Sequence, residues 1–251
     1  MLATVALLFA AARRSLLLKG AARAQVLRVV LRQIYFTGVE AVPLVALLGG
    51  SVGVLVILQS ADRLPDFGQA VFMGKLLVLV ILRELGPILV TFLVAARSGT
   101  AIAAEIGTMS VRGEIDGLAG VGIDPLVYVV WPRVVGVATA VISLTVVFNV
   151  VAFVAGFGFA TLSRPTLSLG ALFDTLFRAM TLADLVVCVT KSGAMGVAIA
   201  GICAHKGLSA RESSTDVPRV TLQAVVSAFW ACLVIELVIT AAFTDLSSLT
   251  P

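Results

Sequence analysis

The stretch LLVLVILRELGPILVTFLVAA, residues 76–96, decides the fold class of this chain. A helix that crosses the hydrocarbon core of a bilayer needs about 20 apolar residues, because each residue advances the helix by about 1.5 Å. Residues 76–96 reach that length, and only Arg83 and Glu84 interrupt their apolar character. The stretch therefore predicts a transmembrane helix that carries two charges inside the membrane.

Four further stretches have the length and apolar character of membrane spans, namely residues 41–61, 134–162, 185–204 and 220–244. Hydrophobic residues make up 60% of the 251 positions and charged residues 13%, whereas soluble domains have roughly 45–50% and 25%. We therefore predict an all-α integral membrane protein with a single domain over residues 1–251. A region over residues 1–37 precedes a five-helix transmembrane domain over residues 38–244.

The distribution of basic residues predicts the orientation of the chain. Twelve Lys and Arg residues lie before the first predicted span, between the second and third, or between the fourth and fifth, and four lie in the other connections. Cytoplasmic connections carry the excess of Lys and Arg. We therefore expect a cytoplasmic N-terminus and a C-terminus outside the cell. The net charge of +4 follows this membrane pattern and does not indicate nucleic-acid binding.

The N-terminal region is expected to stay in the mature protein and to include an interfacial helix. Residues 2–9 are apolar, but Arg13 and Arg14 follow them, whereas a secretory signal has its positive charges first. Between residues 25 and 34, apolar residues recur on one face of a helix and polar residues on the opposite face. This pattern predicts an amphipathic helix in the cytoplasmic interface. Its two faces consist of Leu27, Val30, Leu31 and Ile34, and of Gln25, Arg28 and Arg32.

Four charged residues lie inside the predicted spans, and we expect them to be paired. A charge at mid-membrane costs about 2.5–3.5 kcal/mol, so unpaired charges would be very unfavourable. The four are Arg83, Glu84, Lys191 and Glu236, and their signs cancel. Counted along their helices, all lie roughly 9–12 Å below the outer surface. Such a layer either only fixes helix register, or closes the floor of an outward-facing cavity or meets a lipid headgroup. Gln59 could also line that cavity.

A charged connection between the second and third predicted spans contains four acidic residues and three Arg residues over positions 97–133. In a chain this apolar, such a segment indicates a surface that meets water or another protein. Asp124 directly before Pro125 predicts a helix N-cap and the first residue of the next helix. We expect a short helix parallel to the membrane at about residues 100–124.

In these segments the chain resembles the MlaE (YrbE) family of ABC permeases, which includes phospholipid transporters of Gram-negative envelopes and permeases of Mce systems. The resemblance covers most of the chain from about residue 32 to 244. The segments that carry it are RELGP at 83–87, AARSG at 95–99 through AEIGTM at 104–109, the stretch from Ile115 and Asp116 to Pro132 and Arg133, and Lys191 with Ser192.

This resemblance implies an interfacial helix and five spans, a symmetric homodimer, and a coupling helix that docks on a cytoplasmic ATPase dimer. It also implies an MCE-domain oligomer on the periplasmic side, a STAS-domain subunit in some systems, and a phospholipid substrate. ATP and Mg would be bound by the partner ATPase, and no cofactor by this chain. The residues expected in the lipid pathway are Gln59, Arg83, Glu84, Lys191 and Glu236, and those expected in ATPase coupling are Arg97, Glu105, Met109, Arg112, Glu114, Asp116 and Asp124.

The chain departs from the family pattern at three places. Glu114 and Gly117 stand where the family usually has Gln and Ala. Residues 212–218 replace a glycine-rich loop before the fifth span, and Glu236 stands where the family has Asp. The first two differences concern the ATPase contact, and the third lengthens an embedded carboxylate by one methylene.

Other function classes fit the sequence less well. A membrane-embedded enzyme would need catalytic residues, but the chain has no HExxH or GxSxG motif and one histidine, His205. An ion-gradient-driven secondary transporter usually has internal repeats and broken spans, which are not evident. A purely structural subunit would need no embedded charge. The chain also lacks the GxxxxGK[ST] phosphate loop, so ATP hydrolysis is assigned to a partner. A sterol or a fatty acid remains an alternative lipid substrate.

Overall fold

The computed structural model describes residues 2–15, 21–63, 78–163, 169–210 and 216–249, and all regular structure within them is helical. In chain order the elements are α1 (Leu2–Ser15), α2 (Ala21–Thr37), η1 (Val39–Ala41), α3 (Val42–Arg63), η2 (Val78–Leu85), α5 (Gly86–Val94), η3 (Ala95–Gly99), α6 (Thr100–Val111), α7 (Glu114–Gly120), η4 (Leu126–Val130), α8 (Trp131–Ser163), α9 (Leu169–Ala179), α10 (Leu182–Leu208) and α11 (Asp216–Leu249).

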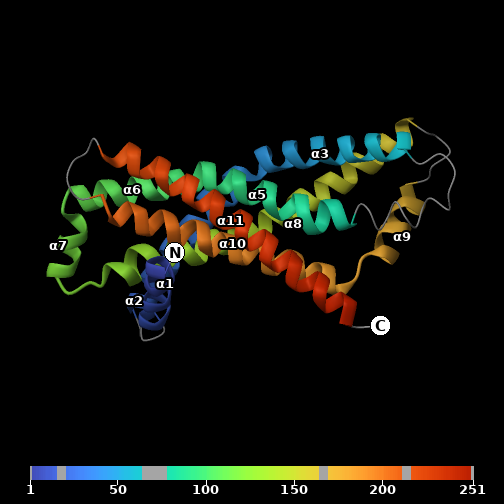
Figure 1. The fold of residues 1–251 in the computed structure, drawn as a ribbon. Helices are drawn as coiled ribbons and strands as arrows, with labels where there is room; N and C mark the ends of the chain where they lie inside the picture. The colour runs from blue at the N-terminus through green and yellow to red at the C-terminus, as the bar shows by residue number, and fades with distance from the viewer. Residues whose placement is uncertain (1, 16–20, 64–77, 164–168, 211–215, 250–251) are drawn as a thin grey trace.

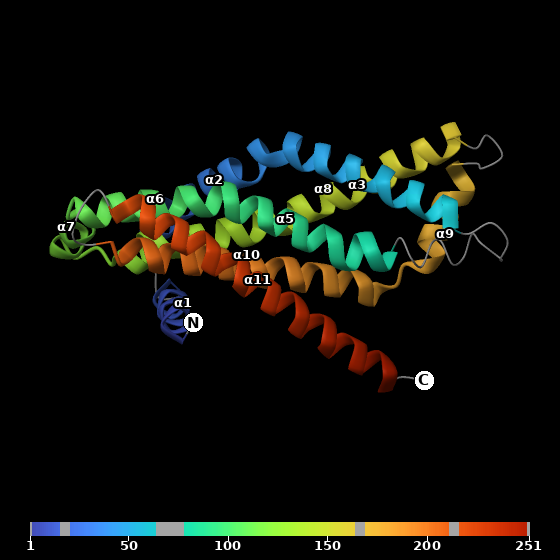
Figure 2. The ribbon, with the colours of Figure 1, turned by 45° about the horizontal axis from the view of Figure 1, so that its top comes forward.

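The long helices run side by side in one elongated bundle, with α7 at one end and α9 at the other (Figure 1). The C-terminus lies toward the α9 end, whereas α1 lies beside the half that is nearer α7 (Figures 1 and 2). Five helical stretches of the described chain are long and apolar enough to cross a membrane, which confirms the predicted number of spans. They cover Ala24–Gln59, Val78–Val111, Leu126–Ser163, Leu182–Leu208 and Asp216–Phe243.

The second span is longer than its sequence predicts. Helical structure continues without a break from η2 through α5, η3 and α6 to Val111, whereas the apolar pattern predicts an end at Ala96. No proline interrupts residues 95–111, and the helix ends where Gly113 adopts a left-handed φ of 71° and donates to the Ser110 carbonyl at 3.1 Å. The region expected to form one coupling helix at about 100–124 therefore divides into α6 and the short helix α7.

The connection from α7 to the third span is built from specific cap residues. Gly122 has a φ of 80°, and Ile123 N donates to the Leu118 carbonyl at 3.0 Å, which closes the end of α7 as a Schellman motif. Asp124 Oδ1 then accepts a hydrogen bond from Leu126 N at 3.0 Å. This bond confirms the N-cap that Asp124 and Pro125 predict.

Helices α3 and α8 cross closely because glycine residues face the opposite backbone. A Cβ atom on Gly49 would lie 2.8 Å from the Phe148 carbonyl oxygen, and one on Gly156 would lie 2.8 Å from the Gly53 carbonyl oxygen. A Cβ atom on Gly53 would collide with the Ala152 carbonyl oxygen. Small residues allow this approach, which in a membrane supplies dispersion contacts where the hydrophobic effect is absent.

The N-terminal region forms two helices that both contact the bundle. Helix α2 packs on α8 through Val30, which is buried, whereas Leu27 and Leu31 on the predicted apolar face are exposed. At the end of α2, Gly38 N donates to the Ile34 carbonyl at 2.7 Å, and a Cβ atom on Gly38 would press on that carbonyl. One part of the apolar face predicted for α2 thus packs against the bundle, and another part is exposed.

Helix α9 is absent from the elements that we predicted. Leu169, Leu172, Phe173, Leu176 and Phe177 recur at helical spacing, so the signal is present in the sequence. Leu176 is buried, and Phe173 meets Phe157 of α8 edge to face with ring centroids 5.0 Å apart. An amphipathic helix therefore covers the end of the bundle opposite α7.

The close crossing of α3 and α8 should make Gly53 intolerant of any side chain. We expect Gly53→Ala to lower the stability of the detergent-solubilised protein by about 1–3 kcal/mol, because its methyl group would force the two backbones apart. Thermal unfolding measures this loss. The matched control is Gly50→Ala on the same helix, whose Cβ atom would sit at an ordinary 3.7 Å from Ala155 Cβ. Equal melting temperatures for the two variants would contradict this account of the crossing.

Candidate functional site

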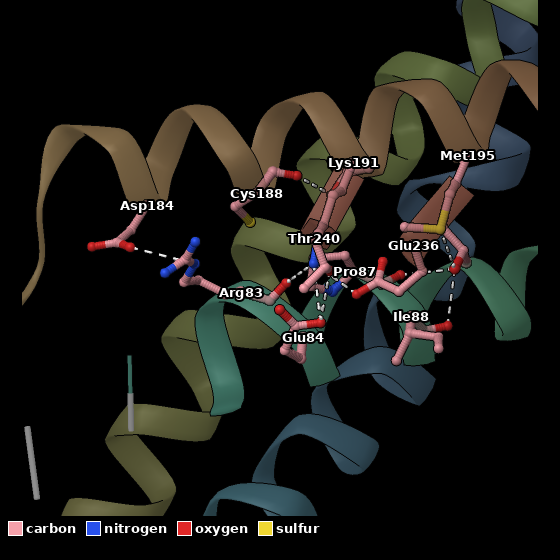
Figure 3. Close-up of polar contacts among 12 residues, drawn as sticks. Arg83, Glu84, Pro87, Ile88, Asp184, Cys188, Lys191, Met195, Glu236 and Thr240 are labelled. Atoms are coloured by element: carbon pink, nitrogen blue, oxygen red, sulfur yellow. Dashed lines mark hydrogen bonds and ion pairs between the residues drawn. The ribbon is translucent and has the colours of Figure 1, made fainter. Parts of the chain in front are cut away.

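The ammonium group of Lys191 on α10 is the centre of a buried polar cluster (Figure 3). The Lys191 side chain is completely buried, and its Nζ donates to Glu84 Oε2 at 3.0 Å, to Glu236 Oε1 at 2.9 Å and to the Arg83 carbonyl at 3.0 Å. An ammonium has three protons, so all of its donors are satisfied. The predicted pairing of Glu84, Lys191 and Glu236 across three helices is confirmed.

Pro87 leaves the backbone carbonyl of Arg83 free to accept from Lys191. In a helix the Arg83 carbonyl would accept from the N–H of residue 87, but proline has none. The turn around this position is a π-helix, η2, which passes directly into α5 at Gly86 and Pro87. The sequence RELGP therefore supplies Lys191 with a carboxylate and a free carbonyl from adjacent residues.

Arg83 makes its ion pair with a residue outside the set that we predicted. Its Nε lies 3.6 Å from Asp184 Oδ1, at the start of α10. Asp184 is buried and also forms a capping box with Thr181, whose Oγ1 donates to Asp184 Oδ2 at 2.7 Å. The spacing of Thr181 and Asp184 is readable in the sequence as a capping box. It was missed because the predicted span begins only at residue 185.

Asp184 changes the charge balance of the cluster. The embedded charges that the sequence reveals cancel, whereas the structure adds a third carboxylate to the two carboxylates and two cations. Among the described residues the cluster thus has one more acidic than basic group, and the predicted electroneutrality of the layer is wrong. Lys191 is shared by the carboxylates of Glu84 and Glu236, while Arg83 pairs with Asp184.

Several polar atoms in and beside the cluster lack a hydrogen-bond partner within the described part of the chain. They are Arg83 Nε, Glu236 Oε2 and Asn149 Oδ1, all buried. Asn149 lies on α8 and donates through Nδ2 to Cys188 Sγ at 3.7 Å, and a Cβ atom on Gly86 would collide with its Oδ1. Buried polar atoms without a partner usually contact water or a ligand. Asn149 carries no charge, so the sequence gives no sign that it belongs beside this cluster.

The cluster is most open around Arg83 and Glu84. Their side chains are 23% and 35% exposed, against 9% for Glu236 and none for Lys191. Thr240 Oγ1 donates to Glu84 Oε2 at 3.4 Å and so links α11 to the same carboxylate. Gln59, which we expected to line the same space, has an exposed side chain on α3, and no hydrogen bond or ion pair described here joins it to the cluster.

Of the residues expected in ATPase coupling, three form ion pairs with other elements of the same chain. Arg97 donates to the Phe36 carbonyl at 2.9 Å and to Glu40 at 2.7 Å. Glu105 lies on α6, where its carboxylate pairs with the buried Arg133 at 2.9 Å. Asp124 pairs with Arg14 at 2.6 Å. These residues connect helices to one another.

The remaining residues of that set lie at the α7 end. Arg112, Glu114 and Asp116 are exposed, and Met109 packs against the hydrophobic core. Beside them Val121 is 74% exposed and Ile123 is 42% exposed. The structure therefore offers one short surface, α7 with Val121 and Ile123, that combines acidic and apolar side chains at the tip of the bundle. Of the divergent residues 212–218, positions 212–215 lie outside the described residues, and 216–218 begin α11.

Residues 30–242 match the model of a protein family described as "Permease MlaE". The chain belongs to the MlaE permease family. It is 30% identical over 217 residues to a "Probable ABC transporter permease protein" of Rickettsia felis, covering 86% of this chain and 83% of the relative. A probable ABC transporter permease of Synechocystis is 32% identical over 81% of this chain and 77% of its own length. The Haemophilus influenzae protein named "Intermembrane phospholipid transport system permease protein MlaE" is 26% identical over 84% of this chain and 80% of its own length.

Membership of this family confirms the resemblance and the fold class that the sequence predicts. This member of the family is an ABC-type, multi-pass transporter subunit of the inner membrane. Its spans, its buried cluster and its exposed α7 are thus parts of a transporter. An ion-gradient-driven secondary transporter, the alternative left open by the sequence, does not fit this family.

Removing the Lys191 ammonium should destabilise the permease strongly. In Lys191→Met two carboxylates and the Arg83 carbonyl lose their shared donor, and breaking a buried ion pair typically costs about 3–5 kcal/mol. Thermal unfolding in detergent measures the loss. The control is Arg178→Met, which removes an exposed pair with Asp174 and should leave the melting temperature nearly unchanged. Adding Glu236→Gln to Lys191→Met should recover part of the stability, and failure of both expectations would contradict the cluster's central role.

Proposed function

We propose that this permease moves phospholipid between the inner membrane and an MCE-domain protein outside it, driven by ATP hydrolysis in a partner ATPase. The observation that carries the proposal is the continuous helical stretch from Val78 to Val111. It holds Arg83 and Glu84 near one end and leads through Gly113 into the exposed α7 at the other. A mechanical input at α7 can therefore reach the polar cluster through one element.

A phospholipid suits the polar cluster chemically. Glu84 and Arg83 are adjacent, oppositely charged and partly exposed, while the neighbouring surface of the spans is apolar. A lipid headgroup is polar and its chains are apolar, so both parts find matching surroundings. The name of the Haemophilus influenzae relative refers to phospholipid transport, which supports the same substrate class for this chain. We therefore favour phospholipid over a sterol or a fatty acid.

The α7 end is proposed to face the cytoplasm. Arg112 follows α6, Arg133 lies near the start of α8 and Lys206 near the end of α10, and these helix ends lie toward α7 (Figure 1). Cytoplasmic connections are rich in Lys and Arg. In this orientation the N-terminus is cytoplasmic, the C-terminus is periplasmic, and α9 lies at the periplasmic surface. The exposed α7 then meets a cytoplasmic ATPase, and its acidic side chains favour a basic rim on that partner.

The assembly that we propose contains two copies of this chain, an ATPase dimer that binds ATP and Mg, and an MCE-domain oligomer on the periplasmic side. A STAS-domain subunit belongs to it in some systems of this type. The family resemblance supports these partners. When the two ATPases close, they would press both α7 helices, and α6 with α5 would transmit the movement to Arg83 and Glu84. The space between the spans would then alternate between two widths, which loads or ejects a lipid.

Glu84 should be required for transport more than for assembly. We expect Glu84→Gln to reduce lipid transfer about tenfold, because the carboxylate that meets both Lys191 and the open side of the cluster is lost. Transfer of a fluorescent phospholipid in proteoliposomes with the ATPase measures the effect, and co-purification of the ATPase measures assembly. The control is Asp174→Asn, the same change from carboxylate to amide at an exposed side chain on α9. Equal transfer by Glu84→Gln and the wild type would count against the lipid pathway.

Asp116 should be required for communication with the ATPase. Asp116→Lys reverses an exposed charge in the middle of α7, and we expect stimulation of ATP hydrolysis by the permease to fall at least about fivefold. Asp174→Lys, an exposed carboxylate on α9 at the opposite end, should leave stimulation unchanged. Steady-state ATPase rates of the reconstituted complex decide the question. Full stimulation with Asp116→Lys would remove α7 from the coupling surface.

A further inference from the structure

Helix α1 lies outside the residues that match the family model, yet it is fitted against the matched part of the chain. Ala11 is completely buried, and Leu8 fills the space above Gly201 of α10, where a Cβ atom would lie 2.8 Å from Leu8 Cδ1. The helix also contacts η4, the first turn of the third span. Because the family match begins at residue 30, this contact is additional to the elements that the match covers.

The last turn of α1 reaches the connection that follows α7. Arg14 Nη1 lies 2.6 Å from Asp124 Oδ2, with the two side chains 56% and 32% exposed. The other carboxylate oxygen of Asp124 accepts from Leu126 N and caps the third span. One carboxylate thus joins α1 to the start of the third span, since each of its oxygens is used for a different neighbour.

Helix α7 itself has few internal restraints. None of its residues is buried, and left-handed glycines, Gly113 and Gly122, lie just outside its two ends. Gly117 and Gly120 have open space where a Cβ atom would be. On its inner side only Ile115 and Leu118 pack against the core. The position of α7 therefore depends strongly on what holds the ends of its connection.

We propose that Arg14 is a positioning residue for α7, and that α1 holds Asp124 so that α7 keeps its orientation toward the ATPase. Leu8 packs on Gly201 of α10 and Ala11 is buried, so α1 is fixed to the bundle where Arg14 contacts Asp124. The role in coupling rests on the proposed function of α7. The effect of Arg14 on the connection can be measured in the permease alone.

Hydrogen exchange of the amides between Gly113 and Asp124 tests the first step. In the purified permease, Arg14→Ala should increase exchange in this segment about two- to fivefold, the range that an exposed ion pair can account for. Arg13→Ala removes the neighbouring exposed Arg from the same turn of α1 and should leave exchange at the wild-type rate. Equal rates for Arg14→Ala and Arg13→Ala overturn the proposal.

Asp124→Asn separates the ion pair from the helix cap. Asparagine keeps an oxygen for Leu126 N but has no charge for Arg14. We expect this variant to accelerate exchange as Arg14→Ala does, and the double variant to add little, because both changes remove the same contact. Additive acceleration in the double variant overturns the proposal.

The reconstituted complex tests the second step. Arg14→Ala should lower permease-dependent stimulation of ATP hydrolysis by a similar two- to fivefold, while the ATPase still co-purifies. Unchanged stimulation together with faster exchange overturns the positioning role. If instead the wild-type permease stimulates no ATPase at all, the proposed function fails, and the exchange measurements still decide whether Arg14 holds the α7 connection.

Discussion

Burial of the Lys191 ammonium is the constraint on which the rest of this permease depends. A charge of this kind inside a membrane is tolerated only when all of its donors are occupied by acceptors of suitable charge. Here the acceptors come from η2 and α11, so three spans must meet at one height and with one rotation about their axes. Apolar contacts alone would not fix that register, because lipid tails and aliphatic side chains offer nearly the same surroundings.

The second span combines the polar cluster and the connection to α7 in one helix. Pro87 removes an N–H from the helix and leaves the Arg83 carbonyl to Lys191, so the same residue that loosens the span also ties it to α10. Farther along, Arg97 at η3 bonds to Glu40 and the Phe36 carbonyl, and Glu105 of α6 bonds to Arg133. The span is held at three heights by polar contacts with other elements. A displacement of α7 that reaches this span would therefore change several of these contacts at once.

The sequence predicts those parts of the structure that follow from a large free energy of transfer into the membrane, either favourable for apolar residues or unfavourable for charged ones. Apolar length decides the number of spans, and the cost of burying charge decides that Glu84, Lys191 and Glu236 meet. Features that depend on a specific contact were not predictable in the same way. The partner of Arg83 is Asp184, which lies outside the predicted span, and the second span continues past residue 96 because no proline ends it there. Helix α9 has a readable apolar pattern, but it is too short to be recognised by a search for spans.

Polar residues within the spans fall into two physical groups. Hydroxyl groups such as those of Thr139 and Thr190 donate to the carbonyl four residues earlier in their own helix, so they need no partner elsewhere. Glu84, Lys191, Glu236 and Asn149 are satisfied only by other helices, and Glu236 and Asn149 each retain a buried oxygen without a hydrogen bond in the described chain. Any movement of the spans leaves the first group unchanged and must rearrange the second. The polar residues that cannot be satisfied locally are therefore the ones whose interactions can differ between two states of the transporter.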